Sequence, residues 1–285
     1  PIIRALMRAA ENGKEVMTLV VLKARFDEDN NIQWAKQLEQ AGIHVVYGIL
    51  GFKTHTKIAL VVRKEKGRLR NYFHIGTGNY NSNTSRYYTD IGFLSTDPDI
   101  SSDLIELFNY LSGFSKQKAY QKLLVSPTSL RKKFIFLINR EIENIEKGKK
   151  GEIIAKMNSL VDPEIIQLLY LASQKGVKIH LIIRGICCLY PQRENLSENI
   201  KVTSIIGHFL EHSRIFWFYN NNNPEVFIGS ADWMRRNLDR RIEAVTPVED
   251  LKLKSQLYDL LQTYIDDNYY SWIMNKDGIY EKKER

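Results

Sequence analysis

The strongest constraint in this sequence is a short motif that occurs twice: a histidine, one further residue and then a cation. His55 and Lys57 open one apolar run, and His212 and Arg214 open another. Because side chains of a strand alternate between its two faces, each histidine lies on the same side as its cation. Each run is followed by a turn, a second apolar run and then Gly-Thr or Gly-Ser. The chain therefore reads as two related halves that each supply half of one site.

The segments around the two motifs also repeat. In both halves an amphipathic segment with helical spacing ends at a glycine, and a short apolar strand and an arginine follow. A further short strand precedes each histidine. This pattern predicts an α/β fold, built as two α/β/α domains related by an internal pseudo-twofold repeat, with the active site between them. The matching segments are helices 2–12 and 163–174, strands 15–22 and 177–183, Arg25 and Arg184, and strands 43–47 and 200–206.

The connection at 113–125 has little periodicity, so we place the domain boundary there. The first domain is then 1–118, with the His55 half-site, and the second is 119–285, with the His212 half-site. We expect the strand at 15–22 to be buried on both faces, because it is almost continuously apolar. We also expect one strand over 88–94 and a frayed charged tail after the helix at 250–266. 

Composition indicates a globular chain with a basic surface. Of 285 residues, 44% are hydrophobic, and 41 Lys and Arg oppose 33 acidic residues, for a formal charge of +8. This charge favours polyanionic partners. No apolar run approaches the roughly 20 residues of a spanning helix. The adjacent Cys187 and Cys188 cannot easily meet disulfide geometry, so we expect buried thiols and a cytoplasmic protein.

The paired histidines and cations favour phosphoryl transfer. Near neutral pH an imidazole is a good nucleophile, and a second imidazole can give a proton to the leaving group. Lys57 and the arginines can stabilise several phosphate oxygens. The sequence has no cluster of zinc ligands, which argues against a zinc site. It also has no Walker A loop and no kinase glycine-rich loop, so it does not bind phosphates through either of these loops. The arginines are Arg25, Arg184 and Arg214.

The sequence gives less specific predictions for the other polar and aromatic residues. Asn79 and Asn81 follow the first Gly-Thr-Gly turn, where they could contact a phosphohistidine or could only form the turn. The aromatic run 216–218 lies in an apolar strand and is expected in the core, so no nucleic-acid partner is predicted. The remaining histidines are expected to be structural, with two of them possible neighbours of the site. These are His44 and His180, and, as possible neighbours, His74 and His208.

At this level of detail the sequence resembles known families. The duplicated His-x-cation motif with a downstream Gly-Thr-x-Asn resembles the phospholipase D superfamily, although no Asp follows Lys57 at the superfamily's position and Arg214 replaces the usual lysine. Longer strings resemble the bacterial polyphosphate kinases with a phospholipase D-like catalytic half, over about residues 1–248. They include the segments 22–31, 53–57, 74–81, 86–90, 183–187, 210–214 and 230–234.

The resemblance implies two phospholipase D-like domains and reversible transfer of the ATP γ-phosphate to inorganic polyphosphate. It implies that His55 becomes phosphorylated and that His212 acts as acid or base. By the resemblance, Tyr88, Arg184 and His212 match nucleotide-contacting positions and Arg241 is a phosphate-contact candidate; the residue types add Arg214 and Asn79 as candidates for phosphate contact. Arg25 matches a position of the magnesium site, and because arginine cannot ligate a cation, it would act through phosphate oxygens.

The resemblance also implies partners. These are ATP, ADP, Mg²⁺, polyphosphate, and the N-terminal and head domains of the same polypeptide, which the sequence lacks. It implies a homo-oligomer in the cytoplasm, or peripheral at the inner face of the membrane. Two other functions stay open from the residues alone. One is a phosphodiesterase or nuclease of the phospholipase D type, and the other is a non-catalytic module that binds polyanions.

Overall fold

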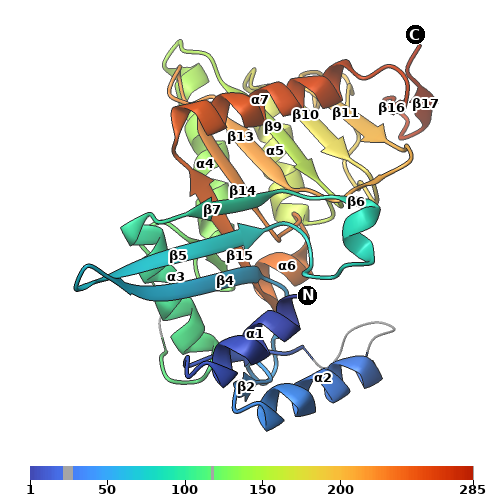
Figure 1. The fold of residues 1–285 in the computed structure, drawn as a ribbon. Helices are drawn as coiled ribbons and strands as arrows, with labels where there is room; N and C mark the ends of the chain where they lie inside the picture. The colour runs from blue at the N-terminus through green and yellow to red at the C-terminus, as the bar shows by residue number, and fades with distance from the viewer. Residues whose placement is uncertain (22–27, 117–118, 285) are drawn as a thin grey trace.

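The computed structural model describes residues 1–21, 28–116 and 119–284, with only the backbone described at 28–30. The fold is α/β. A wide, helix-covered sheet forms the larger part of the molecule, and a smaller part built from the first half of the chain lies against one of its edges (Figure 1).

The wide sheet has ten strands in the order β17-β16-β11-β10-β9-β13-β14-β15-β3, with β8 paired to β15. The strands β9, β10 and β11 are parallel to one another, the pairs β9-β13, β13-β14 and β14-β15 are antiparallel, and β3 is parallel to β15. The bounds are β3 Lys53–Thr54, β8 Leu124–Ser126, β9 Glu152–Met157, β10 Lys178–Ile183, β11 Ile200–Ile205, β13 Ile215–Phe218, β14 Glu225–Gly229, β15 Arg241–Val248, β16 Ser271–Met274 and β17 Tyr280–Lys282.

Helices cover both faces of this sheet (Figure 1). Phe134 and its neighbours on α4 and α5 pack on one face together with the buried aromatic Phe216, while α7 packs on the other face against Trp217. The expectation that the aromatic run 216–218 lies in the core is therefore confirmed. The helices are α4 Leu130–Glu146, α5 Pro163–Gln174 and α7 Leu251–Asp266, and the short α6, Arg235–Asp239, precedes β15.

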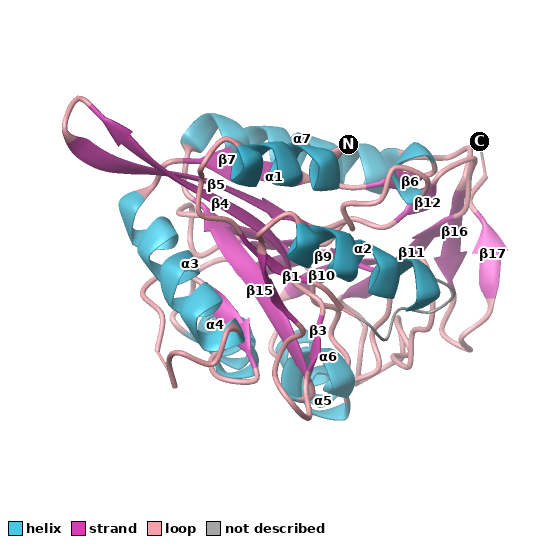
Figure 2. Cartoon of the chain, turned by 60° about the horizontal axis from the view of Figure 1, so that its bottom comes forward, coloured by secondary structure: helices cyan, strands magenta, loops and turns pink. Residues whose placement is uncertain are grey.

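The first half of the chain forms a three-stranded sheet, β4-β5-β7, packed on α3. Beyond the part paired with β7, the β4–β5 hairpin projects from the body of the molecule (Figure 2). A small parallel pair, β1-β2, lies beside α1 and α2. The bounds are α1 Ile2–Glu11, β1 Met17–Leu19, α2 Glu28–Gln40, β2 His44–Val46, β4 Lys57–Glu65, β5 Arg68–Gly76, η1 Thr84–Arg86, β7 Gly92–Ser95 and α3 Pro98–Leu111.

The single strand expected over 88–94 is wrong, because the segment is divided between two sheets. Its start, β6 (Tyr88–Thr89), pairs with β12 (Leu210–Glu211) of the second half, whereas β7 pairs with β5. Between them, Ile91 is bound to the first Gly-Thr turn: its carbonyl accepts from Thr77 N at 2.9 Å, and its N–H donates to Thr77 Oγ1 at 2.9 Å. These contacts turn the chain from one sheet to the other.

Three further expectations need correction. The described part of the strand at 15–22 is only half-buried, because β1 lies in a two-stranded sheet. The tail is ordered as β16 and β17, whose apolar residues Trp272 and Ile273 extend the edge of the wide sheet. Cys188 is exposed rather than buried, and Cys187 is half-buried. Among the described residues, no helix has the length and apolar character needed to cross a membrane.

Candidate active site

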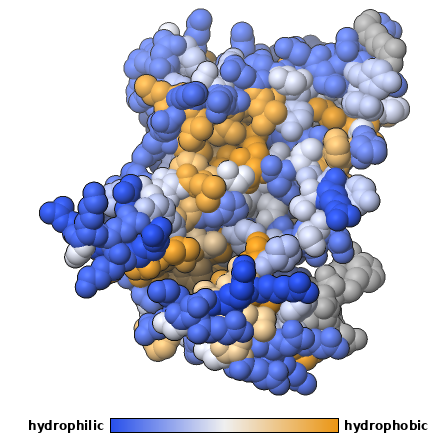
Figure 3. Space-filling view, viewed as in Figure 1, coloured by the Kyte–Doolittle hydropathy of each residue, from blue (hydrophilic) through white to orange (hydrophobic). Residues whose placement is uncertain are grey.

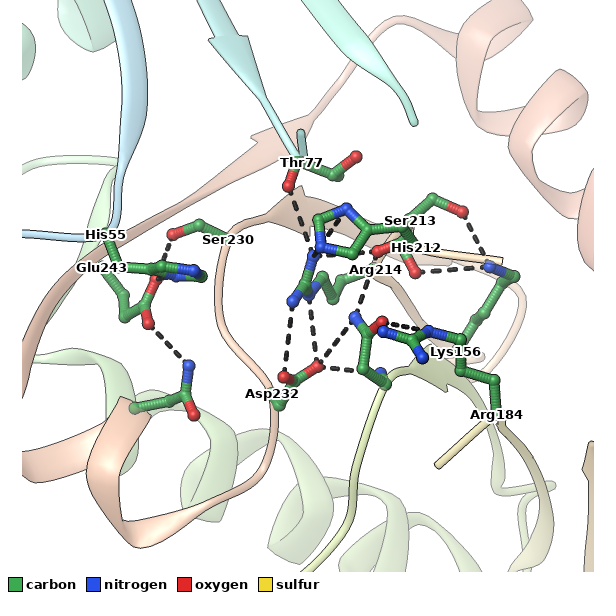
Figure 4. A network of polar contacts seen from close by, with 12 residues as sticks. His55, Thr77, Lys156, Arg184, His212, Ser213, Arg214, Ser230, Asp232 and Glu243 are labelled. Atoms are coloured by element: carbon green, nitrogen blue, oxygen red, sulfur yellow. Dashed lines mark hydrogen bonds and ion pairs between the residues drawn. The ribbon is translucent and has the colours of Figure 1, made fainter. Parts of the chain in front are cut away.

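His55 is held against the second half of the chain through its backbone and its side chain. β3 ends at Thr54 and runs parallel to the start of β15, so that His55 N donates to Ile242 O at 2.8 Å. The next residue of β15 is Glu243, and its Oε2 lies 2.9 Å from His55 Nδ1 (Figure 4). The histidine of the first half thus has its carboxylate partner in the second half.

The second histidine repeats this arrangement with the halves exchanged. β12 runs parallel to β6, with Glu211 opposite Thr89. The following residues, His212 and Asp90, then meet, with His212 Nδ1 at 2.8 Å from Asp90 Oδ1. Each half therefore gives one histidine and one carboxylate, and each carboxylate holds the histidine of the other half. This exchange ties the two half-sites into one site.

The hydroxyls of the Gly-Thr and Gly-Ser turns support the two carboxylates. Thr77 Oγ1 donates to Asp90 Oδ1 at 2.7 Å, and Ser230 Oγ donates to the fully buried Glu243. Asn237 Nδ2 adds a third donor to Glu243 at 2.6 Å. Glycine is required beside Asp90, because a Cβ at Gly78 would lie 2.0 Å from Asp90 Oδ2. The glycine and hydroxyl residues of the two turns thus hold the carboxylates in position, and the carboxylates in turn orient the histidines.

The position of the two carboxylates determines which imidazole nitrogen can react. A carboxylate only accepts hydrogen bonds, so the Nδ1 of each neutral histidine carries the proton. His55 then keeps the lone pair on Nε2. The bond to Asp90 likewise leaves the lone pair of His212 on Nε2, and Arg214 Nη1 lies close to both nitrogens of this ring, at 3.1 Å from Nε2 and 3.3 Å from Nδ1.

Two buried cations lie beside the histidines. Lys57, only 5% exposed, donates from Nζ to the carbonyl oxygen of His55, and burial lowers the Lys57 pKa to about 7. Arg214, 3% exposed, donates to His212 O at 2.8 Å and pairs with Asp232 at 3.2 Å. The site therefore holds positive charge that is removed from water.

Arg184, Tyr88 and Arg241 extend the site. Arg184 Nε donates to Asn158 Oδ1, and the same Asn158 donates from Nδ2 to His212 O at 3.1 Å. The centre of the Tyr88 ring lies 4.9 Å from the centre of the His212 ring. Burial lowers the pKa of both Arg184 and Arg241, and repulsion from Arg214 lowers both further. Such a group of cations is suited to a ligand with several negative charges.

Both imidazoles have a lowered pKa in this site. Burial is the main cause for each, and the charges of Lys57 and Arg214 lower both further, against the opposing effect of the paired carboxylate. For His55 the carboxylate is Glu243, and for His212 it is Asp90. The same two cations thus act on both histidines, and both rings are neutral near pH 7.

One residue predicted from the sequence cannot be placed, another is not part of this network, and others were missed. Arg25 lies outside the described residues. Asn79 is exposed, and the structure gives a contact only to its carbonyl oxygen, from Asn81 N at 2.8 Å. Asn81 is a turn residue, because its Oδ1 accepts from Asn83 N at 2.8 Å. The residues missed are Asp90, Glu243, Asp232, Asn158, Thr77 and Ser230.

Asp232 occupies in the second half the position of Asn79 in the first, and it balances the charge of Arg214. We expect Asp232→Ala to lower the free energy of unfolding by about 3 to 5 kcal/mol, because it leaves a buried guanidinium unpaired. Denaturant unfolding measures this value. Glu164→Ala is the matched control: Glu164 is 59% exposed and pairs with Arg131, so we expect a loss below about 1 kcal/mol. Equal losses in the two variants would contradict a charge-balancing role.

Comparison with known proteins identifies the family. The family described as polyphosphate kinase C-terminal domain 1 matches residues 1–117, and polyphosphate kinase C-terminal domain 2 matches residues 123–285. The chain belongs to the polyphosphate kinase family. It is 66% identical over 284 residues to a polyphosphate kinase of Parasynechococcus marenigrum and 56% identical over 283 residues to one of Synechocystis, covering 100% and 99% of this chain.

Solved structures agree with this membership. The polyphosphate kinase of Porphyromonas gingivalis superposes with a TM-score of 0.92 at 40% identity over 100% of this chain and 43% of that one. The phosphatidylserine synthase of Haemophilus influenzae shares only the fold, with a TM-score of 0.56 at 7% identity over 98% of this chain and 87% of that one. The chain spans 40% and 39% of the length of the two curated relatives above.

The donor set of the site does not form a metal centre by itself. Within residues 1–21, 28–116 and 119–284, no group of three or more His, Cys, Asp and Glu side chains could hold a metal ion. The carboxylates of the site are engaged, Asp90 and Glu243 by histidines and Asp232 by Arg214. Magnesium prefers carboxylate and phosphate oxygens, so these residues do not fit a magnesium site made of protein ligands alone.

Proposed function

We propose that this chain is the catalytic part of a longer polyphosphate kinase, which reversibly transfers the γ-phosphate of ATP to inorganic polyphosphate through a phosphohistidine on His55. The observation that carries the proposal is the exchanged pairing of His55 with Glu243 and of His212 with Asp90, around the buried cations Lys57 and Arg214. Membership of the polyphosphate kinase family supports the choice of substrates.

In the first step, the Nε2 lone pair of His55 attacks the γ-phosphorus, and the bond from that phosphorus to the β,γ-bridging oxygen breaks. ADP leaves with the bonding electrons. The imidazole keeps its Nδ1 proton and becomes a cation when Nε2 is phosphorylated, so the buried carboxylate of Glu243 stabilises it at 2.9 Å. Lys57 and Arg214 stabilise the phosphoryl oxygens.

In the second step, a terminal oxygen of polyphosphate attacks the phosphohistidine, which lengthens the chain by one phosphate and restores neutral His55. His212 is the proposed proton carrier, which gives its proton to the leaving oxygen of ADP in the first step. It is neutral in the free site, and the negative charge of a bound phosphate would raise its pKa and favour the imidazolium that gives a proton. Asp90 stabilises that imidazolium at 2.8 Å.

The remaining residues have proposed roles in binding. Tyr88 and Arg184 would contact the nucleotide, with Arg241 and Asn79 as further phosphate contacts. Mg²⁺ would be held through the phosphates of the nucleotide, with Arg25 acting on those phosphates. We further propose that the additional length of the relatives supplies domains that complete the enzyme, that it forms a homo-oligomer, and that it works in the cytoplasm or at the inner face of the membrane, where ATP is available.

The pH dependence of kcat/KM for ATP tests the roles of His55 and Lys57. His55 must be neutral to attack, and its pKa lies below the usual 6.5, so activity should fall only below that pH. The Lys57 pKa of about 7 means that its charge is lost as the pH rises through 7 in the free site. We therefore expect a bell-shaped profile whose alkaline limb lies near pH 7, because kcat/KM reports the free enzyme.

Lys57→Arg is the matched variant, because an arginine stays charged at every pH used. We expect the alkaline limb near pH 7 to disappear in this variant while the acid limb remains. An alkaline limb unchanged by the substitution would assign that limb to another group.

The rival activity is tested with the same protein. Sustained turnover of ATP only when polyphosphate is extended, beyond the one ADP per site that phosphorylation of His55 releases, supports the proposal. Cleavage of a phosphodiester without nucleotide would instead support the phospholipase D-type alternative. Polyphosphate binding with no turnover of either substrate by the full-length protein would leave only a polyanion-binding module.

A further inference from the structure

The β4–β5 hairpin carries a line of cations that the proposed reaction does not use. Its register places alternate cross-strand pairs on one face, beginning at the site with Lys57. We call the arginines of this face the basic row; they are Arg63, Arg68 and Arg70. From the site to the tip, the pairs on this face are Lys57 with Gly76, Ala59 with His74, Val61 with Tyr72, Arg63 with Arg70 and Glu65 with Arg68.

The basic row lies well outside the site, on the same face of the hairpin as Lys57. Arg63 is 63 − 57 = 6 residues from Lys57 along one strand, which corresponds to about 20 Å at roughly 3.4 Å per residue. None of the hairpin residues on this face between Lys57 and the Arg63–Arg70 pair is acidic, and among the described residues the one carboxylate that reaches them is that of Glu65, at Tyr72 Oη. The end of the hairpin projects into solvent and is hydrophilic in Figure 3. A long anion that leaves Lys57 along this face would therefore reach the row.

The charges of the row are only partly balanced within the protein, because three arginines face one carboxylate, that of Glu65. Arg63 and Arg70 stand directly opposite each other, where like charges are destabilising. Glu65 lies 3.5 Å from Arg63, and its carboxylate already accepts from Tyr72 Oη at 3.0 Å. In the part of the chain that the structure describes, Arg68 and Arg70 form no ion pair. An anionic ligand would remove this repulsion.

The arginines of the row are also held in position. The guanidinium carbons of Arg63 and Arg70 lie 5.9 and 5.5 Å from the centre of the Tyr72 ring. Cation–π contacts at this distance orient the planar guanidinium groups. Nearer the site, His74 lies against bare backbone, since a Cβ at Gly92 would be 2.3 Å from its Nε2. The hairpin side chains of this face between the site and the row are thus uncharged or imidazole groups: Ala59, His74, Val61 and Tyr72.

We propose that this face of the β4–β5 hairpin binds the polyphosphate chain at phosphates distant from the reacting one. The proposal rests on the proposed function, because the anion enters the row from the site. A linear polyanion without bases fits better than a nucleic acid: Tyr72 is engaged by two guanidinium groups and by Glu65, so it is not a free platform for base stacking.

The test compares two triple variants of the full-length protein that remove the same charge. One is Arg63→Gln, Arg68→Gln and Arg70→Gln. The matched control is Lys147→Gln, Lys149→Gln and Lys150→Gln, in the exposed basic turn between α4 and β9. Affinity is measured for a long polyphosphate and for tripolyphosphate, which is too short to reach from the site to the row.

We expect the arginine variant to bind long polyphosphate about tenfold more weakly, from three exposed charge contacts. Its affinity should depend less steeply on salt concentration, because fewer counterions are released. Its affinity for tripolyphosphate should be unchanged, as should both affinities of the lysine control.

Four results would overturn the proposal. They are an unchanged affinity for long polyphosphate, an equal loss in the lysine control, an equal loss for tripolyphosphate, and single-stranded RNA binding as tight as that of polyphosphate. Repeating the binding measurements on a His55→Ala background separates this proposal from the reaction. If His55 is not the nucleophile, the predicted loss of activity in His55→Ala is not found, whereas the difference in polyphosphate affinity between the two triple variants persists.

Discussion

His55→Ala should abolish polyphosphate synthesis, with a fall in kcat of at least about 10⁴-fold, as expected when a covalent nucleophile is removed. The variant should fold normally, because the side chain makes one hydrogen bond, to Glu243, and is 23% exposed. Affinity for ATP should change little, since Lys57, Arg184 and Arg214 remain. Steady-state kinetics with polyphosphate as acceptor and unfolding in denaturant measure the two effects.

His44→Ala is the control for this substitution. His44 is an exposed histidine on β2, and its removal should leave both kcat and stability unchanged. If His55→Ala keeps more than a small fraction of the activity, a direct transfer from ATP to polyphosphate replaces the covalent route.

Glu243→Gln should slow phosphorylation of His55 by about 10² to 10³-fold while His55 stays in place. A glutamine can still bond to the imidazole, but it no longer neutralises the cation that forms when Nε2 is phosphorylated. In serine proteases, kcat falls by about 10⁴-fold when the catalytic histidine loses its buried carboxylate partner. We expect a smaller effect here, because Lys57 and Arg214 still stabilise the phosphoryl oxygens. Rapid-quench measurement of phosphoprotein formation tests this value.

Asp90→Asn is the companion variant, because Asp90 holds the other histidine. Its main effect should fall on the step that needs a protonated His212, so kcat should decrease with a change in its pH profile. Glu141→Gln is the control for loss of a buried carboxylate: Glu141 is fully buried and accepts from Asn220 N at 3.0 Å, away from both histidines. It should lower stability without slowing phosphorylation. Equal kinetic effects of Glu243→Gln and Glu141→Gln would contradict the assigned role.

The two histidines could be predicted from the sequence because the repeated motif consists of residues close together in the chain. Each His-x-cation motif opens a strand, and strand alternation alone puts both side chains on one side. The helix at 163–174 and the burial of the aromatic run were also predictable, from periodicity and apolar character. The domain boundary between residues 118 and 119 stays a prediction.

The exchanged carboxylates could not be predicted in the same way. Asp90 and Glu243 stand at equivalent places after the Gly-Thr and Gly-Ser turns, so the sequence did contain a signal. Their function depends on the parallel pairing of β3 with β15 and of β12 with β6, which joins segments 188 and 122 residues apart. Such contacts are set by tertiary packing, which also divides the segment 88–94 between two sheets.

Locating the phosphate on the protein tests the covalent route through His55. The full-length protein is incubated with ATP and without polyphosphate, kept at alkaline pH, and digested for mass spectrometry, with ³¹P spectroscopy to identify the phosphorylated nitrogen. The exchanged pairing predicts one phosphate on Nε2 of His55, which disappears when polyphosphate or ADP is added. A phosphate on His212, on Nδ1 of His55, or on no histidine at all would rule out attack by Nε2 of His55.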